Sequence, residues 1–339
     1  MTATTEFGAA PSLPVYRRWR SAAINTARRH WLWLWNWPRF SQPIWSRVLN
    51  RQATAHHAAH AMPLTAVQQR AVEDLQRDGI AVLDCAELFS AGAAAEYCAE
   101  AERVLAQPQH SRKVALHATR TPQDGLKYYQ VSLWDEGTLD IGNAFVRFAL
   151  SDQILGVVNG YMEMSARLIT VDLLYTFPMA GPLIASQNWH RDPTDRKVVK
   201  VFLYLRDVHK SSGPFEFVPG SHGDGPHARV FPRKLPQGIY PRPDAVDRRF
   251  SPGQQKTYPG KAGTIVIVDT AGLHRGAHAV DHERYVYVAH FLSDGMYKRD
   301  YFFKTYDYRV TSNGERLSPA ADYALGMWRE HTARRAAAH

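Results

Sequence analysis

Cysteine, long apolar runs and a targeting signal are all scarce or missing in this chain of 339 residues. Its two cysteines, Cys85 and Cys98, lack a metal-binding spacing and are too few for a disulfide framework, which is typical of a reducing compartment. No run of about eighteen apolar residues occurs, so no membrane-spanning helix is predicted. The N-terminus lacks a basic start followed by an apolar stretch, so we expect no secretory signal and a cytoplasmic protein.

Acidic residues are missing from one long segment. Between Phe7 and Val72 there is no Asp, Glu or Lys but there are nine arginines, which account for the whole formal net charge of +9. Six of the nine tryptophans lie in the same segment, at positions 19, 31, 33, 35, 37 and 45. We therefore expect an Arg/Trp-rich arm and linker over residues 1–62, with the linker at 52–62, and a single larger domain over residues 63–339.

Three interpretations of the arm stay open. Its tryptophans can pack on the larger domain, because indole rings bury well and order loose termini. Alternatively, residues 16–51 make peripheral contact with a membrane surface, which suits a basic, aromatic segment too short to span a bilayer. The third interpretation is self-association or a partner interface, where aromatic residues and Arg are enriched. No nucleic-acid-binding module is recognisable, so we expect no nucleic-acid partner.

His190 and Asp192 are the first candidate site residues. In an extended segment, residues separated by one position project from the same face, so an imidazole and a carboxylate converge there. His274 follows the strand-like run TIVIVD (264–269) and is a candidate third ligand. Two histidines and one carboxylate that leave other positions open are typical of non-haem Fe(II) oxygenases. A lone His-x-Asp is common, so its context must decide.

Arg284 supplies part of that context, ten residues after His274 and at the start of the run RYVYVAHF. A guanidinium can bind a carboxylate through two parallel hydrogen bonds. The order His-x-Asp, distant His, then Arg resembles the phytanoyl-CoA dioxygenase family of Fe(II)/2-oxoglutarate oxygenases. The strand VKVFLYLRDV, the turn SSGPF and the run FVPGSH strengthen the resemblance, which covers about residues 64–292.

The resemblance implies a mainly β fold with flanking helices, a double-stranded β-helix (jelly roll, cupin-like) with its core at about 167–292. It also implies that His190, Asp192 and His274 hold Fe(II), that 2-oxoglutarate chelates the iron, and that Arg284 pairs with the distal carboxylate. O2 takes the remaining position, and ascorbate supports the reaction in vitro. Lys127 and Tyr175 are further candidates for cosubstrate binding, with a surface lysine and a packed core tyrosine as the alternatives.

The implied activity is that of a dioxygenase that hydroxylates an unactivated carbon of a small or lipid-like molecule. The intact triad favours hydroxylation over halogenation. Desaturation or cyclisation on the same scaffold stays open, as does a non-oxidative cupin-type metal or binding protein. Two segments, 111–125 and 223–256, are expected to be basic loops over the site, which would suit an anionic substrate, although solvated loop charge explains them equally well.

Other residues and elements are expected as follows. Arg191, an unusual residue between two family ligands, should point away from the metal. His222 should order a turn, His278 and His282 should lie in the loop before Arg284, and His290 should be an interior histidine. The patterns predict helices at 65–78, 89–106 and 142–163 and strands at 80–84, 127–134 and 167–178.

Overall fold

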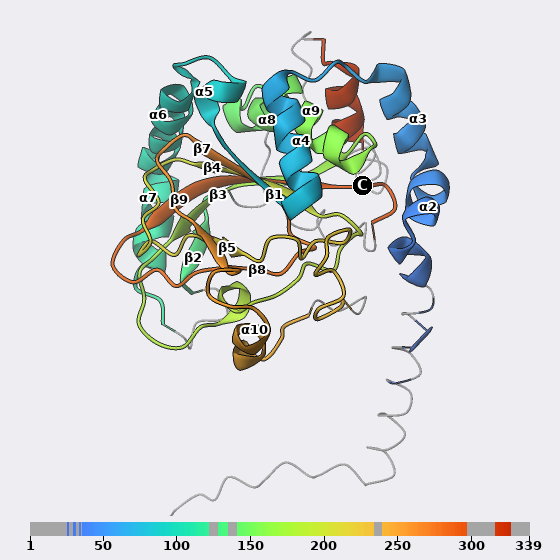
Figure 1. Ribbon diagram of the computed structural model, residues 1–339. Helices are drawn as coiled ribbons and strands as arrows, with labels where there is room; N and C mark the ends of the chain where they lie inside the picture. Colours follow the sequence, from blue (N-terminus) through green and yellow to red (C-terminus); the bar gives the residue numbers. More distant parts are fainter. Residues whose placement is uncertain are drawn as a thin grey trace, which may run out of the picture.

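The computed structural model describes residues 36–121, 128–134, 141–233, 239–296 and 316–326, together with positions 26, 30, 31 and 34. Two antiparallel sheets form its centre, and helices cover the outer face of the larger sheet while the smaller sheet and α10 lie on its other side (Figure 1). The described part of the chain is thus a mainly β jelly roll with flanking helices, as the sequence predicts.

The larger sheet has six strands in the order β1-β7-β4-β9-β3-β2, and the smaller sheet has the order β6-β5-β8. The strands are β1 (Ile80–Asp84), β2 (Gln130–Ser132), β3 (Arg167–Thr176), β4 (Val199–Tyr204), β5 (Phe215–Phe217), β6 (Lys256–Tyr258), β7 (Thr264–Asp269), β8 (His274–Gly276) and β9 (Arg284–Leu292).

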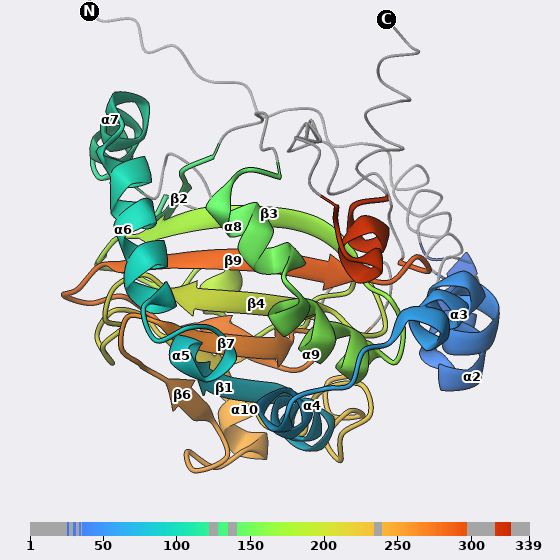
Figure 2. The same ribbon diagram turned by 90° about the horizontal axis from the view of Figure 1, so that it is seen from above.

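Most helices precede the central strands. They are η1 (Trp37–Phe40), α2 (Gln42–Ile44), η2 (Trp45–Leu49), α3 (Arg51–His60), α4 (Ala66–Asp78), α5 (Cys85–Leu88), α6 (Ala93–Ala106), α7 (Pro108–His117), α8 (Ala144–Leu150), α9 (Asp152–Met162), η4 (Ala185–Gln187) and α10 (Pro243–Arg249). Residues 319–326 are also helical. Seen from above, α6, α8 and α9 lie across the large sheet (Figure 2).

Alternation along the central strands separates two environments. On β4, Val199, Val201 and Leu203 pack into the large cluster beneath the helices. Phe202 and Tyr204 point to the opposite face and pack with the smaller sheet. Because successive side chains of a strand alternate, the inner face between the two sheets is available to polar residues that a site requires.

Local signals explain the elements that the sequence predicts correctly. Thr65 and Gln68 form a reciprocal capping box at the start of α4, and Gly79 ends this helix in the left-handed conformation (φ 80°). The β-branched run of β7 lies between β1 and β4, where both of its edges are paired. Ser151 caps α9 and divides the helix expected over 142–163 into α8 and α9.

Two loop predictions were wrong. The linker expected over residues 52–62 is helical up to His60, as part of α3, in which Ala53 is fully buried. The expected loop over 111–125 is helical up to His117, because Pro108 occupies the first turn of α7, where its missing N–H costs nothing. Residues 122–127 lie outside the described part of the chain.

The described part of the arm packs beside the body, with α2 and α3 along one side of the sheets (Figure 1). Trp45 is fully buried, and its Nε1 donates to Asp195 Oδ1 at 2.8 Å. Asn50 Oδ1 accepts from the backbone N–H of Gly295 at 2.7 Å. Trp31 and Trp37 are instead 64% and 53% exposed. No helix among the described residues is long and apolar enough to cross a membrane.

Candidate metal centre

His190, Asp192 and His274 converge on one point. Each offers a ligand atom, and these atoms all lie within 4.8 Å of one another. Nε2 of His190 is 3.9 Å from Asp192 Oδ1, and Nε2 of His274 is 3.8 Å from Asp192 Oδ2. The two imidazoles are buried, so the triad is shielded from solvent on the side of the histidines.

The backbone brings the triad together through an antiparallel bridge. His190 and His274 exchange two backbone hydrogen bonds of 2.9 Å, and Asp192 N–H donates to Thr270 O at 2.9 Å. The segment around His190 is therefore extended, which places His190 and Asp192 on one face as the sequence predicts. His274 opens β8, whose pairing with β5 fixes its direction.

Both imidazoles are oriented by carbonyls. Nδ1 of His190 is 2.9 Å from Asn188 O, and Nδ1 of His274 is 3.0 Å from Gly272 O. A carbonyl can only accept, so each Nδ1 carries the proton and each Nε2 keeps its lone pair for a metal ion. Two imidazole nitrogens and a carboxylate form a donor set that fits a divalent transition metal.

Electrostatics keep these ligands in their metal-binding protonation states. Burial, followed by the neighbouring His190, lowers the pKa of His274 well below its ordinary value. Burial alone would raise the pKa of Asp192, but Lys200 and the two histidines hold it well below its ordinary value. His274 is therefore neutral and Asp192 is ionised at neutral pH.

Arg191 points away from the triad and holds the surrounding loops. Its guanidinium donates to the carbonyls of Ser221, Ala271, His227 and Val230. It is 2% exposed, so these bonds replace its lost hydration. The residue between the two ligands thus stabilises the segment expected to cover the site.

Arg284 lies on the inner face of β9. A Cβ added to Gly276, two residues after His274, would stand 3.5 Å from Arg284 Nη2, so the guanidinium occupies the space that this glycine leaves. Nη1 donates to Gly213 O, whereas Nε is buried without a hydrogen-bond partner among the described residues. An orphaned guanidinium nitrogen is a ready donor to a carboxylate.

The structure does not bring Tyr175 to this site, so that expectation was wrong. Tyr175 pairs with Tyr285 on the neighbouring strand, and Tyr285 donates to Ala101 O of α6 on the helix-covered face. The hydroxyl of Tyr175 donates to Glu283. Since paired residues share a face, Tyr175 lies on the side of the sheet opposite to Arg284. Lys127 lies outside the described residues.

The other histidines stay apart from the triad, which is the only such metal-binding group among the described residues. His222 is buried against the end of α4, where its Nε2 is 3.1 Å from Gln76 O. His282 contacts Ser211 in the loop before Arg284. Burial, followed by Lys200, lowers the pKa of His290 to about 3, so this interior histidine is neutral.

Two charged residues near the triad were not singled out in the sequence. Lys200 on β4 donates to Asp192 Oδ2 at 2.7 Å. Asp195 is buried and accepts hydrogen bonds from Trp45 and from Ser293 N–H. A charged residue on the inner face of an otherwise apolar strand was the available signal for Lys200. Nothing local distinguishes Asp195, because its partners are about 100 or more residues away in the chain.

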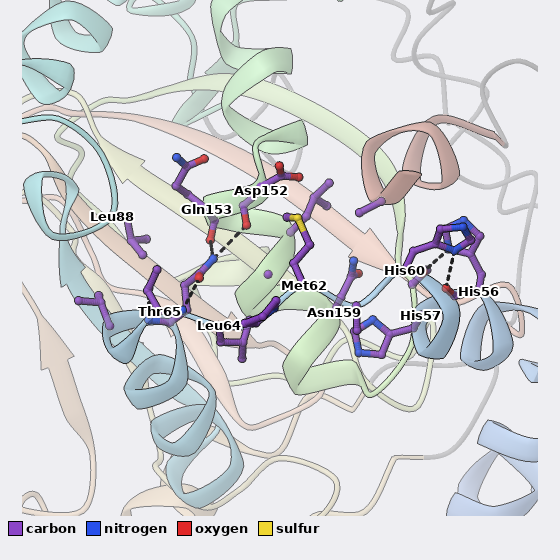
Figure 3. Close-up of a pocket in the computed structure, with 18 of the residues that line it drawn as sticks. His56, His57, His60, Met62, Leu64, Thr65, Leu88, Asp152, Gln153 and Asn159 are labelled. Carbon is purple, nitrogen blue, oxygen red and sulfur yellow. Dashed lines mark hydrogen bonds between the residues drawn. The ribbon is translucent and has the colours of Figure 1, made fainter. Parts of the chain in front are cut away.

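A separate hollow of about 630 Å³ lies between α3, α4, α5 and α9 and contains none of the triad residues. Figure 3 shows Leu64, Met62 and Leu88 along it, with His56, His57 and His60 at one end. His56 is bound to Ser165 at 2.8 Å and stacks on His60, so these imidazoles pack with the helix and do not converge as the triad does.

The profile of one protein family, phytanoyl-CoA dioxygenase (PhyH), matches residues 75–280, more than half of the chain. The chain belongs to the PhyH family. The matched range includes the three triad residues and ends before Arg284, so the geometry alone supports a role for that arginine.

A curated PhyH relative is phytanoyl-CoA dioxygenase domain-containing protein 1 of Danio rerio. It is 30% identical over 105 residues, which span 28% of this chain. The match covers 33% of the length of that relative.

Several solved structures are similar to this chain. The non-haem α-ketoglutarate-dependent epimerase SnoN from nogalamycin biosynthesis is 23% identical with a TM-score of 0.46, over 67% of this chain and 84% of its own. EctD from S. alaskensis with bound Fe is 18% identical with a TM-score of 0.45, over 68% and 77%. HygX from Streptomyces hygroscopicus, with nickel and 2-oxoglutarate, is 18% identical with a TM-score of 0.43, over 68% and 87%.

Proposed function

We propose that this PhyH protein is a non-haem Fe(II)/2-oxoglutarate-dependent dioxygenase that hydroxylates an unactivated carbon of a small or lipid-like molecule. In the balanced reaction, a substrate C–H bond, 2-oxoglutarate and O2 yield the alcohol, succinate and CO2. One oxygen atom enters the substrate and the other enters succinate. The electrons that reduce O2 come from both reactants, two from the substrate C–H bond and two from the keto acid.

The observation that carries this proposal is the pairing of a His-Asp-His group with an arginine in one inner space. His190, Asp192 and His274 would hold Fe(II) through Nε2, a carboxylate oxygen and Nε2. Arg284 would bind the distal carboxylate of 2-oxoglutarate with its unpaired Nε and a terminal nitrogen. A non-oxidative cupin has no need of such a carboxylate clamp.

Iron, when bound, supplies the oxidative decarboxylation of the keto acid and the oxidation of the substrate C–H bond. The chain itself orients the reactants and limits water. Phe215 stacks on His274 with ring centroids 5.6 Å apart, and Phe202 packs on Phe215 at 5.5 Å. These rings form an apolar wall on the inner face beside the centre, where they exclude water.

The test is succinate formation from 2-oxoglutarate by purified protein on addition of Fe(II) and ascorbate. We expect turnover in the wild type and in His282→Ala, which changes an exposed histidine outside the triad. His274→Ala should lose it. If the wild type forms no succinate with iron present, or if His274→Ala forms as much, the proposed activity is wrong.

The mass of the product identifies which oxidative outcome occurs. A screen of cell extract by mass spectrometry should find a product that has gained one oxygen atom. Loss of two hydrogens would indicate desaturation or cyclisation, and an isomer of unchanged mass would indicate epimerisation, the activity named for SnoN. Either result replaces hydroxylation while it keeps the same iron centre.

An anionic substrate has less support than the sequence suggests. Arg233, in the segment 223–256 that was expected to be a basic loop over the site, is part-buried and donates to the carbonyls of Asp195 and Arg196. Arg248 pairs with Asp244. Arg233 and Arg248 are thus engaged within the protein itself, which leaves fewer basic residues of these segments to attract a carboxylate or phosphate. Neutral substrates alone in the screen would exclude the electrostatic contribution.

We further propose that residues 63–339 form the oxygenase domain and that the arm has two parts. The part from residue 36 onward belongs to the folded body, because Asn36, Trp45 and Asn50 are buried there. The part before residue 36, with Trp31 and Leu34 exposed, is left for peripheral contact with an anionic membrane surface. Full-length protein that fails to sediment with anionic vesicles at low salt would remove the membrane contact.

A further inference from the structure

Lys200 is a cation on the inner face of a strand whose other residues are apolar or aromatic. On β4 it lies between Val199 and Val201, which point into the core beneath the helices. Its cross-strand neighbours are Val268 on β7 and His290 on β9. Alternation therefore directs the amine into the space between the sheets, where the triad lies.

The amine is bound to the acidic residue of the triad. Lys200 Nζ is 2.7 Å from Asp192 Oδ2, and the two side chains are only 24% and 20% exposed. Asp192 Oδ1 faces His190, and Asp192 Oδ2 faces His274. The carboxylate could thus offer one oxygen or both to a metal ion, and Lys200 is bound to one of them.

The number of oxygens that Asp192 donates decides how many positions stay open. A ferrous ion of this class takes about six ligands, of which the protein supplies three when the carboxylate binds through a single oxygen. A chelating keto acid then takes two, and one position is left for O2. If both carboxylate oxygens bind, the keto acid fills every remaining position.

We propose that Lys200 is a positioning residue that holds Asp192 Oδ2 away from the metal, so that Asp192 binds through Oδ1 alone. The inference rests on the proposed function, because it concerns the same metal centre. The proposed role explains why a lysine lies here, because a cation beside a divalent metal ion otherwise only lowers the affinity of the site for the metal.

This role predicts an unusual pair of effects. Lys200→Met removes both the repulsion and the hydrogen bond, so metal affinity should be unchanged or higher, while the metal keeps one fewer exchangeable water. A lysine that merely supported the fold would produce the opposite result, with weaker metal binding and no change in hydration. The two readouts therefore separate positioning from structural support.

The test uses Mn(II), which is stable in air, as the probe. We would measure its dissociation constant and the number of exchangeable waters by water-proton relaxation in full-length protein. Lys200→Met should have one fewer water than the wild type, and none after 2-oxoglutarate is added. Lys200→Gln, too short to reach Asp192, should behave in the same way and serves if the Met variant fails to fold.

Two controls complete the comparison. Lys200→Arg retains a charged donor and should restore the hydration of the wild type, and Lys256→Met, on exposed β6, should leave it unchanged. Equal hydration in the wild type and in both Lys200→Met and Lys200→Gln overturns the assignment of Lys200. A wild type that binds no Mn(II) instead overturns the proposed metal centre, so the two failures are distinguishable.

Discussion

At the residue scale, alternation along β9 assigns adjacent residues to different tasks. Arg284 and His290 face the space between the sheets, whereas Tyr285 and Tyr287 face the helices and donate to backbone carbonyls there. Tyr175 shares the face of Tyr285. Adjacent residues of a strand face opposite sides of the sheet, so the neighbour of a candidate site residue is not expected to reach the same site.

Replacing Arg284 should weaken 2-oxoglutarate binding far more than metal binding. Loss of a buried bidentate partner typically costs about 2–5 kcal/mol, so Arg284→Ala should raise the dissociation constant of 2-oxoglutarate by roughly 30-fold or more. Anaerobic calorimetry of the metal-loaded protein measures this. Arg206→Ala is the matched control, since Arg206 pairs with Glu102 away from the site. An unchanged dissociation constant in Arg284→Ala would assign the clamp to another residue.

His290 should make stability depend on pH. Its folded-state pKa is lowered from 6.5 to about 3, chiefly by burial. The unfolded chain therefore gains a proton that the folded chain resists, and the free energy of unfolding falls as the pH drops from about 6.5 towards 3, by about 1.4 kcal/mol per pH unit for this group.

The variant His290→Gln should remove that contribution. Urea unfolding of metal-free protein, measured in chelator at several pH values between ~6 and ~4, should give a slope against pH that is shallower by about 1.4 kcal/mol per unit than in the wild type. Equal slopes in the two proteins would show that His290 does not resist protonation in the folded chain.

The positions of the triad residues and of Arg284 could be predicted because each residue lies beside a strand that its own sequence pattern reveals. The prediction for His190 and Asp192 required only an extended backbone, and the prediction for His274 required only the β-branched run that precedes it. Lys200 was passed over because its importance depends on register, which places it opposite His290 and toward Asp192. The register between two distant strands cannot be predicted from the sequence of either strand alone.

At the scale of elements, helices were harder to predict than strands. The central strands carry dense β-branched and aromatic runs, and their ends fall close to the expected residues. The segment that forms α3 is rich in alanine and was expected to belong to a linker, whereas the segment that forms α7 is polar and basic and was expected to belong in part to a loop over the site. Alanine has the highest helix propensity, and tertiary contacts such as Ser165 N–H to Ala53 O at 3.1 Å stabilise such helices further.

The packing of η2 on the body predicts that Trp45 is a major source of stability. Trp45→Ala should lower the free energy of unfolding by about 3–5 kcal/mol, as truncation of a buried large aromatic does. Trp45→Phe, which mainly loses the bond to Asp195, should cost about 1–3 kcal/mol. Trp37→Ala, at a largely exposed position, should change stability by no more than about 0.5 kcal/mol. Equal urea midpoints for the two alanine variants would contradict the packing.

At the scale of the whole molecule, the excess of positive charge lies in the N-terminal region, whereas the candidate metal centre is formed by residues much later in the chain. Arg39 and Arg196 join them, since Arg39 Nε donates to Gly295 O at 2.9 Å and Arg196 Nε donates to Gln42 at 2.7 Å. Asp195 lies three residues after Asp192 and is held by Trp45. The described arm therefore supports the loop that follows the metal-binding segment.

Retention of iron by the purified protein tests the central claim most directly. After anaerobic loading and dialysis, the wild type and His282→Ala should each retain stoichiometric Fe(II), while His190→Ala and His274→Ala should retain almost none. In the first two proteins, 2-oxoglutarate should bind only when iron is present. Stoichiometric Fe(II) in both triad variants, or 2-oxoglutarate binding that is indifferent to iron, would contradict the account.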